Sequence, residues 1–216
     1  MGSLALTGWL SEQPADFRAW VAEVGQLHRY TIGQYVYHAN DVATAVYGLR
    51  SGAVEIEFPL IADEPVSLIR RTNGFWIGDA GLLSGQTRIV SVLAVEDCSC
   101  LVLSAAVIHK YLEREPKHWQ SFYDLSHRNI RTAIELLAES LALTVRARVC
   151  RRLLELSENR VEANTTQDAL AKSLGVARPT LRRSLTSLFE LGAIESKYRR
   201  IRIVDRRILE QFKNEQ

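Results

Sequence analysis

The sequence is short of the features that mark several large classes of protein. Its longest apolar run, Cys100 to Ile108, is half the roughly 18 residues that a membrane-spanning helix needs. The first residues lack the basic start and small-residue cleavage pattern of a secretory signal. Only three cysteines are present, an odd number that argues against a disulfide scaffold and fits a reducing compartment. We therefore expect a cytoplasmic protein without a membrane segment.

Metal-binding and catalytic patterns are also scarce. Cys98 and Cys100 fall on one predicted strand, where alternate side chains share a face. Two ligands do not complete a structural zinc site, so we interpret both as buried apolar cysteines, with a soft-metal or redox pair as the alternative. No nucleophile with a paired base and no pair of carboxylates stands out, and the sequence therefore does not predict an enzyme.

The charges are unevenly distributed along the chain. Residues 1–140 carry 11 Lys and Arg against 16 Asp and Glu, a net charge of −5, whereas residues 141–216 carry 16 against 9, a net charge of +7. The C-terminal third is therefore basic, whereas the rest of the chain is acidic. This distribution indicates a polyanionic partner for that third alone.

The hydrophobic pattern changes from strands to helices along the chain. From about Tyr30 to Leu103, segments rich in Val, Ile and Tyr alternate with Gly, Asn and Asp, which predicts a β-barrel or roll, and a short helix is predicted ahead of it. Residues 116–143 begin with Pro, contain no Gly and repeat apolar residues at alternating spacings of four and three. This pattern predicts one long helix, either as part of the core or as a homodimer interface.

The basic third has the pattern of a helix-turn-helix. Thr165 and Asp168 form a variant capping box for a first helix that ends at Leu174, and Gly175 supplies the turn. A second helix follows, with basic and hydroxyl side chains at its start and on its exposed side: Arg178, Thr180, Arg182 and Arg183. Pro179 is compatible with this helix only within its first turn.

A basic hairpin follows the second helix. The segment AIESKYRRIRIVD predicts two short strands around a tight turn from Lys197 to Arg200, which is typical of a winged helix whose wing contacts the phosphate backbone. An ordinary solvated face explains any single arginine, but not the turn residues, the basic helix start and the hairpin together. We therefore predict DNA binding.

These features together resemble the Crp/Fnr (catabolite activator) family of bacterial transcription regulators. The matching stretches are AVYGLRSGAVEI, FWIGDAGLLSGQTR, the helix from Pro116 to Leu143, and TTQDALAKSLGVARPTLRR, in the family's order. The resemblance implies an α+β fold: an effector-sensing, cyclic-nucleotide-binding-like β-roll (jelly-roll) with an N-terminal helix at 1–115, a long dimerisation helix at 116–143, and a winged helix-turn-helix at 144–216. It also implies a homodimer on a palindromic operator in double-stranded DNA, with RNA polymerase as a further partner.

The resemblance gives the roll a degenerate cyclic-nucleotide pocket. The family's glycine, glutamate, arginine, hydroxyl and two base-contacting hydroxyl positions correspond to Gly78, Asp79, Arg88, Ile89, Ala133 and Ile134. Losing two or three hydrogen bonds to charged groups, at about 1.5 to 3 kcal/mol each, moves a micromolar ligand into the millimolar range. The alternatives are an Asp79–Arg88 ion pair, another effector, a vestigial roll on a constitutive regulator, and an enzyme that uses the roll cavity.

Other cofactors of the family leave no trace in the sequence. Residues 1–97 contain no cysteine, so no iron–sulfur cluster is expected. Haem needs an axial ligand, and we interpret the five histidines as surface residues. No cofactor is therefore assigned.

The resemblance also assigns contacts to DNA. Thr166 and Gln167 correspond to phosphate-contacting positions, and Arg178 to the position that reads a guanine through O6 and N7. Pro179 replaces a glutamate that reads cytosine, so the operator is expected to differ from the family consensus there. The remaining DNA-contacting positions are Thr180, Arg182, Arg183 and, in the wing, Arg199 and Arg200.

Overall fold

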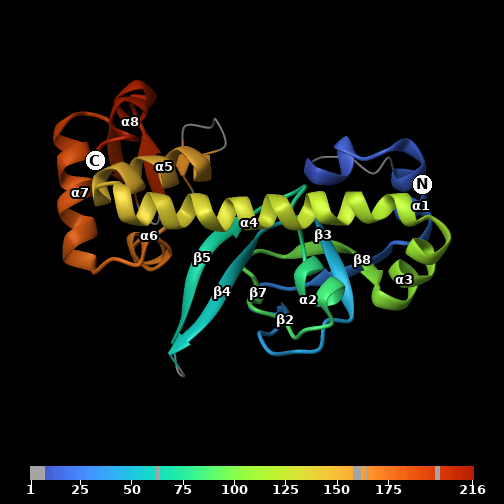
Figure 1. The fold of residues 1–216 in the computed structure, drawn as a ribbon. Helices are drawn as coiled ribbons and strands as arrows, with labels where there is room; N and C mark the ends of the chain where they lie inside the picture. Colours follow the sequence, from blue (N-terminus) through green and yellow to red (C-terminus); the bar gives the residue numbers. More distant parts are fainter. Residues whose placement is uncertain (1–7, 62–63, 158–161, 164, 198–199) are drawn as a thin grey trace. The chain divides into compact units, whose positions relative to one another are not determined.

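The computed structural model describes residues 8–61, 64–157, 162–163, 165–197 and 200–216 (Figure 1). The chain divides into two compact units, Met1–Thr132 and Ala133–Gln216. Each unit has a hydrophobic core of its own. The long helix α4 (Trp119–Ala142) runs across the boundary between them.

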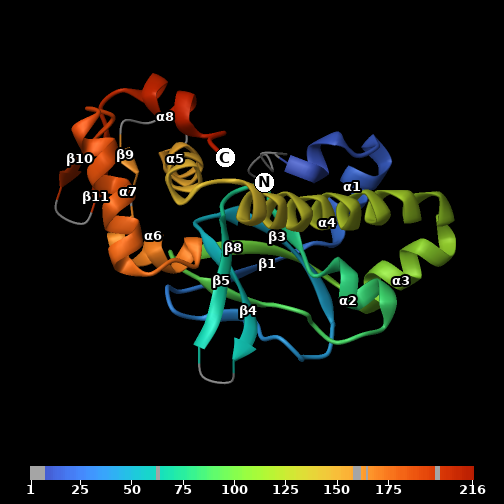
Figure 2. The same ribbon diagram turned by 60° about the vertical axis from the view of Figure 1, so that its left-hand side comes forward.

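The first unit is a β-roll built from antiparallel sheets in the orders β1–β8–β3–β6 and β2–β7–β4–β5 (Figure 2). Val, Ile and Tyr suit these half-buried, pleated strands, and their side chains alternate between the core and the outer face, as in β7. The predicted roll is confirmed, with strands β1 (Gln26–Tyr30), β2 (Tyr35–Tyr37), β3 (Ala45–Ser51), β4 (Val54–Ile61), β5 (Glu64–Arg71), β6 (Trp76–Ile77), β7 (Ser91–Ala94) and β8 (Cys98–Ser104).

Helical segments at both ends of this unit share an aromatic core. The ring of Phe17 lies 5.5 Å from that of Phe122 on α4, and Trp9 lies 5.3 Å from Trp76. All four side chains are buried, and such clusters add edge-to-face attraction to the burial of apolar surface. The contributing segments are η1 (Gly8–Glu12), α1 (Ala15–Val24), α3 (Ala105–Arg114) and η2 (Pro116–His118), while α2 (Asp79–Ser84) lies in the roll.

The expectation that every histidine lies on the surface is wrong for His118. Its side chain is 3% exposed, its ring is 5.2 Å from that of Phe17, and its Nε2 lies 3.3 Å from Asp16 Oδ2. Sequence periodicity missed this because His118 precedes the regular part of the helix. It packs through the single turn of η2.

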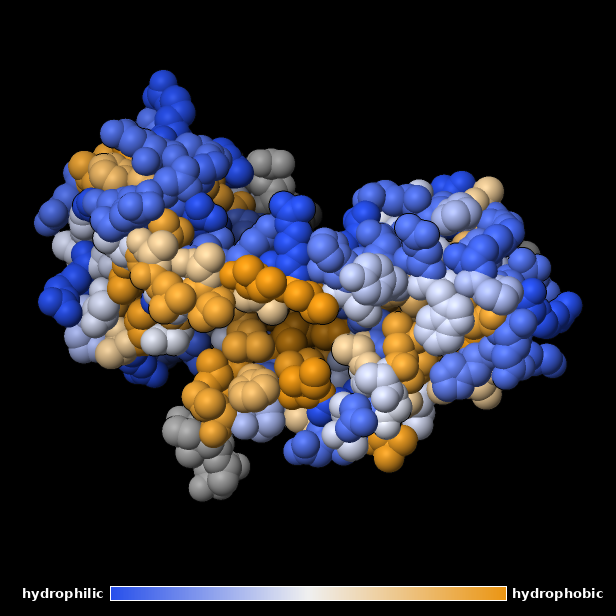
Figure 3. Space-filling model, in the orientation of Figure 1, coloured by the Kyte–Doolittle hydropathy of each residue, from blue (hydrophilic) through white to orange (hydrophobic). Residues whose placement is uncertain are grey.

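The predicted helix at 116–143 is divided at its start into η2 and α4. Phe122 and Leu125 face the core of the roll. Most of the other large apolar residues of α4 are exposed, and Figure 3 shows hydrophobic surface over the C-terminal half of α4. The exposed members are Trp119, Tyr123, Ile130, Ile134, Leu137 and Leu141.

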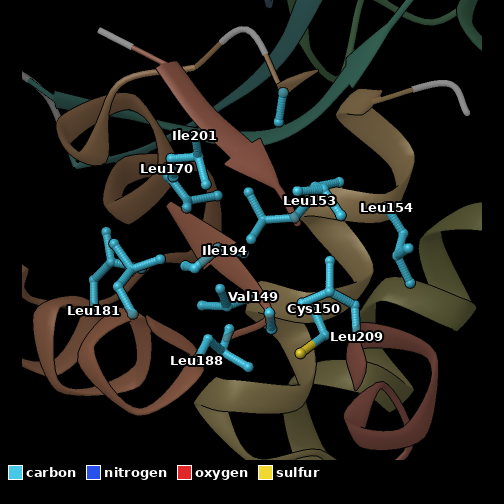
Figure 4. Close-up of a cluster of buried hydrophobic side chains, with 14 of the residues drawn as sticks. Val149, Cys150, Leu153, Leu154, Leu170, Leu181, Leu188, Ile194, Ile201 and Leu209 are labelled. Carbon is cyan, nitrogen blue, oxygen red and sulfur yellow. The ribbon is translucent and has the colours of Figure 1, made fainter. Parts of the chain in front are cut away.

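The second unit combines helices and a small sheet around one apolar core (Figure 4). Leu153, Leu170, Leu181 and Leu188 are fully buried in it, and Cys150 packs among them. The sheet has the order β10–β11–β9. The elements are α5 (Val145–Ser157), β9 (Glu162–Ala163), α6 (Gln167–Leu174), α7 (Arg178–Glu190), β10 (Ile194–Lys197), β11 (Arg200–Ile203) and α8 (Arg206–Phe212).

Helices α6 and α7 form the predicted helix-turn-helix. The cap of α6 is Thr166 rather than Thr165, because the Thr166 side chain accepts the Ala169 N–H. Gly175 ends α6 with φ 62°, a left-handed conformation that glycine adopts at little cost. Pro179 is the second residue of α7, within the first turn, where its missing N–H has no helical partner.

The arginines of α5 are engaged inside the second unit. Arg146 forms an ion pair with Glu215 and lies over the ring of Phe212, and Arg151 bonds Glu139 at 2.7 Å. The Glu215 side chain also accepts from Thr144 at the start of α5, at 3.0 Å. The segment after α8 is therefore held against the junction of α4 and α5.

The ion pair with Arg146 lowers the pKa of Glu215 below its usual value. A carboxylate with a depressed folded-state pKa stabilises the protein above its unfolded value of about 4.3 and loses that contribution as the pH falls through the folded-state value. We expect Glu215→Gln to lower the free energy of unfolding by about 1 kcal/mol at pH 7, the scale of a partly screened charged hydrogen bond. The difference should shrink below the unfolded value, as measured by urea unfolding across pH.

A matched control is Glu190→Gln, which alters an exposed glutamate at the end of α7. It should leave the unfolding free energy within experimental error of the parent. A Glu215→Gln deficit that stayed constant down to pH 3 would contradict the role given to the ion pair.

Candidate functional site

The start of α7 presents an open cationic surface. A groove of about 660 Å³ is lined by Arg178, Pro179, Arg182, Arg183, Thr186, Ser187 and Glu190. The three arginines are exposed, because the opposite face of α7 buries Leu181, Leu185 and Leu188 in the core. The structure therefore gathers the predicted base-reading positions on one helix face, with Thr180 half-buried beside Arg183.

The phosphate-contacting candidates lie at the start of α6. The Thr166 hydroxyl accepts the Ala169 N–H at 3.1 Å as the helix cap, which leaves its own hydrogen free to donate. Gln167 is exposed next to it. The helix N-terminus adds a partial positive charge, so this end of α6 is suited to an anionic group.

The predicted DNA-contacting residues of the wing are Arg199 and Arg200. Arg200, at the start of β11, forms an exposed ion pair with Glu162 on β9 at 3.0 Å. Arg199 lies outside the described residues. Residue periodicity did not reveal the Glu162 contact, because it depends on the order of the small sheet.

The structure shows an ion pair that sequence reasoning missed. Arg178 Nε lies 2.9 Å from Asp168 Oδ1, which joins the first turn of α6 to the first turn of α7. Asp168 was interpreted from the sequence only as part of a capping box. The spacing of ten residues across a helix-turn-helix is the signal that could have suggested the pair.

The predicted phosphate cassette of the roll is a compact arrangement around Arg88. Arg88 is 4% exposed, and its guanidinium donates to the carbonyl oxygens of Gly78, at 2.6 Å, and Ala45, at 2.5 Å. Tyr37 lies against it, 4.4 Å from ring centroid to guanidinium carbon. Burial raises the pKa of the Tyr37 hydroxyl, which therefore stays neutral.

Gly78 is needed for this arrangement in two respects. Its φ of 102° is a conformation that other residues adopt only with strain. A Cβ at this position would also lie 2.6 Å from an Nη atom of Arg88. Glycine thus permits both the turn and the approach of the guanidinium.

Asp79 has partners on α4. Its carboxylate accepts from the Ser126 hydroxyl and, at 2.9 Å, from Asn129 Nδ2, which also bonds the Trp76 carbonyl oxygen at 3.2 Å. The Asp79–Arg88 ion pair that the sequence left open is not formed in the described structure, since each side chain has other partners. A polar pair, Ser126 and Asn129, inside an apolar helix stripe is the sequence signal for this contact.

The charge of Arg88 has no carboxylate partner among the described residues. Its Nε is buried without a hydrogen-bond partner, and the two carbonyl oxygens supply only partial charges. A buried cation in this state is costly unless an anion completes its surroundings. The remaining effector candidates, Ala133 and Ile134, belong to the second unit and are exposed on α4.

The cysteines are confirmed as buried, free thiols. Burial raises the pKa of Cys100 and of Cys150 to about 12, so neither is a thiolate near neutrality. Within the described ranges, no cluster of His, Cys, Asp or Glu has the arrangement to hold a metal ion. No helix among the same residues is both long and apolar enough to cross a membrane.

Comparison with known families matches both units in the order found here. The model described as a cyclic nucleotide-binding domain matches residues 27–115, and that described as a Crp-like helix-turn-helix domain matches residues 147–212. The chain belongs to the Crp/Fnr family of transcription regulators. The matched ranges cover the roll and the helix-turn-helix and leave most of α4 between them.

Individual proteins are similar to this chain in sequence or in fold. The transcriptional regulatory protein btr of Bordetella pertussis is 22% identical over 182 residues, which cover 80% of this chain and 75% of btr. FixK2 from Bradyrhizobium japonicum has a TM-score of 0.75 at 20% identity, covering 88% of this chain and 97% of its own. The c-di-GMP-responsive regulator CLP of Xanthomonas campestris has a TM-score of 0.73 at 19% identity. The match covers 89% of this chain and 100% of the CLP chain.

Proposed function

We propose that this chain is a sequence-specific DNA-binding transcription regulator that acts as a homodimer on a two-fold symmetric operator. The observation that carries the proposal is the exposed cationic face of α7, with Arg178 at its first position and Arg182 and Arg183 one turn later. A helix of this kind fits the major groove, where an arginine fork recognises guanine. Thr166 and Gln167 contact phosphates beside it and fix the register of the helix.

Arg178→Ala tests base reading. Because a bidentate arginine–guanine contact discriminates by about 1 to 3 kcal/mol, we expect the preference for guanine at one position of each half-site to fall by about 5- to 150-fold. The measurement is a binding selection from randomised duplexes, followed by titration of the selected duplex and its single-base variants at fixed salt.

The matched control is Gln167→Ala, which removes a phosphate contact. It should weaken binding to all duplexes to a similar degree and leave the base preference unchanged. If Arg178→Ala instead weakened every duplex equally, the base-reading role of Arg178 would be wrong.

The exposed stripe of α4 supports the homodimer. Ile130, Ile134, Leu137 and Leu141 are 58%, 61%, 59% and 79% exposed and follow one another at spacings of four and three. Such a stripe is the pattern of a helix that packs against a parallel copy of itself. A two-fold axis along this pair of helices also explains a two-fold operator, since the symmetry of the protein is then mirrored in the DNA.

Leu137→Glu should dissociate the dimer, because pairing would then bury two like charges on facing helices. We expect the mass measured by light scattering to fall from that of a dimer to that of a monomer at micromolar protein, with a parallel loss of operator binding. Ala142→Glu is the control: it adds the same charge at an exposed site of α4 about 140° around the helix from Leu137 and should leave the dimer intact. A dimeric Leu137→Glu variant would contradict this interface.

The roll is proposed to hold an effector other than a cyclic nucleotide. Asp79 is engaged by Ser126 and Asn129, and Ile89 replaces the hydroxyl expected beside Arg88. The unpartnered Nε of Arg88 supports an anionic ligand. The internal partners of Asp79 and Arg88 equally favour the second candidate, a constitutive regulator whose roll has no ligand.

Thermal unfolding with millimolar cyclic AMP or cyclic GMP tests this pocket. A ligand present at 100 times its dissociation constant adds about 2.7 kcal/mol, which is several degrees in melting temperature. We expect no shift beyond that given by 5′-AMP at the same concentration. A shift of several degrees with either cyclic nucleotide, and none with 5′-AMP, would show that Arg88 still anchors a cyclic phosphate.

A further inference from the structure

The first turn of α7 contains no acidic residue, yet its leading arginine has a carboxylate partner. The partner is Asp168, from the first turn of α6, with Arg178 Nε 2.9 Å from Asp168 Oδ1. Both side chains are well exposed, at 74% and 62%, so the pair is open to a ligand that approaches α7. The described structure gives the Nη groups of Arg178 no partner.

A carboxylate is unfavourable on a surface that contacts DNA. The neighbouring charged side chains, Lys172, Arg182 and Arg183, are cationic and exposed, as neutralisation of phosphates requires. The dipole of α6 accounts for an acidic residue near the N-terminus of that helix. It does not account for the contact between Asp168 and Arg178, the arginine proposed to read guanine. The position of Asp168 beside Arg178 therefore needs a further explanation.

The geometry of the pair supplies that explanation. Guanine presents O6 and N7 side by side, and an arginine reads them with two parallel N–H donors. With Nε 2.9 Å from Asp168 Oδ1, the two Nη groups at the end of the side chain remain available as the fork. A long exposed arginine otherwise samples many rotamers, and ordering it on binding opposes association.

Among the described residues, those that directly follow Arg178 on α7 are not its partners. Pro179 has no side-chain acceptor, and Thr180 Oγ1 is 3.5 Å from an Nη atom of Arg183 rather than Arg178. The acid that orients the arginine therefore comes from the other helix of the motif. We infer that Asp168 is a specificity-determining positioning residue, which orients the Arg178 fork toward guanine without contacting DNA itself.

This inference rests on the proposed reading of guanine by Arg178, and a double-mutant cycle separates the two. The duplex selected from a randomised pool by the full-length protein is titrated together with a copy in which the Arg178-dependent guanine pair is replaced. The proteins are the parent, Asp168→Ala, Asp168→Asn, Arg178→Ala and the Asp168→Ala/Arg178→Ala double variant. Glu190→Gln, at the far end of the same groove, is the control for removing an acidic charge.

We expect Asp168→Ala to lower the ratio of the two affinities by about 2- to 12-fold, the cost of ordering one long side chain. Its affinity for the replaced duplex should rise, because a negative charge has been removed near the phosphates. Asp168→Asn keeps an oxygen acceptor and should retain more of the ratio than Asp168→Ala. In the Arg178→Ala background, Asp168→Ala should leave the ratio unchanged.

Each contrary result has a distinct meaning. If Arg178→Ala makes the affinities for the two duplexes equal while Asp168→Ala leaves their ratio unchanged, the positioning role is wrong and the proposed function stands. If Arg178→Ala leaves the base preference intact, both fail. If Asp168→Ala changes the preference at another base pair in the Arg178→Ala background, Asp168 reads a base directly and the positioning role is overturned. Melting temperatures of all variants check that the exposed substitutions leave the fold intact.

Discussion

The packing of Phe122 and Leu125 into the aromatic core of the roll determines how α4 is used along its length. With 3.6 residues per turn, fixing these two side chains also fixes the direction of every later one in the helix. Ser126 and Asn129 hydrogen-bond Asp79, and Ile130, Ile134, Leu137 and Leu141 are left exposed. The buried contact of Phe122 and Leu125 thus accompanies both the hydrogen bonds of Ser126 and Asn129 to Asp79 and the exposed apolar stripe of α4.

The sequence predicted the elements well where their periodicity is strong. The roll, the long helix and the helix-turn-helix were all expected, and Gly175 and Pro179 occupy the roles that their chemistry indicates. Errors are local. Thr166 replaces Thr165 as the cap because the choice between adjacent threonines depends on one hydrogen bond, and His118 is buried because it packs beside Phe17 from a distant part of the chain.

The candidate sites were less predictable than the fold, because their chemistry depends on partners far apart in sequence. Positions 78, 79 and 88 were identified, but the carbonyl oxygen of Ala45 and the side chains of Ser126 and Asn129 were not. Net charge was also a poor guide to the DNA surface. Arg146 and Arg151 add to the basic total of the second unit, yet both are engaged in its internal contacts.

The close approach of Arg88 to Gly78 couples two positions that are ten residues apart. A side chain at position 78 would meet the guanidinium and the Ala45 carbonyl oxygen, at 2.6 and 3.0 Å from a Cβ. Replacing this glycine would therefore strain the backbone, whose φ is 102°, and would require the end of the Arg88 side chain to move. The contact thus ties the side chain allowed at position 78 to the course of the Arg88 side chain.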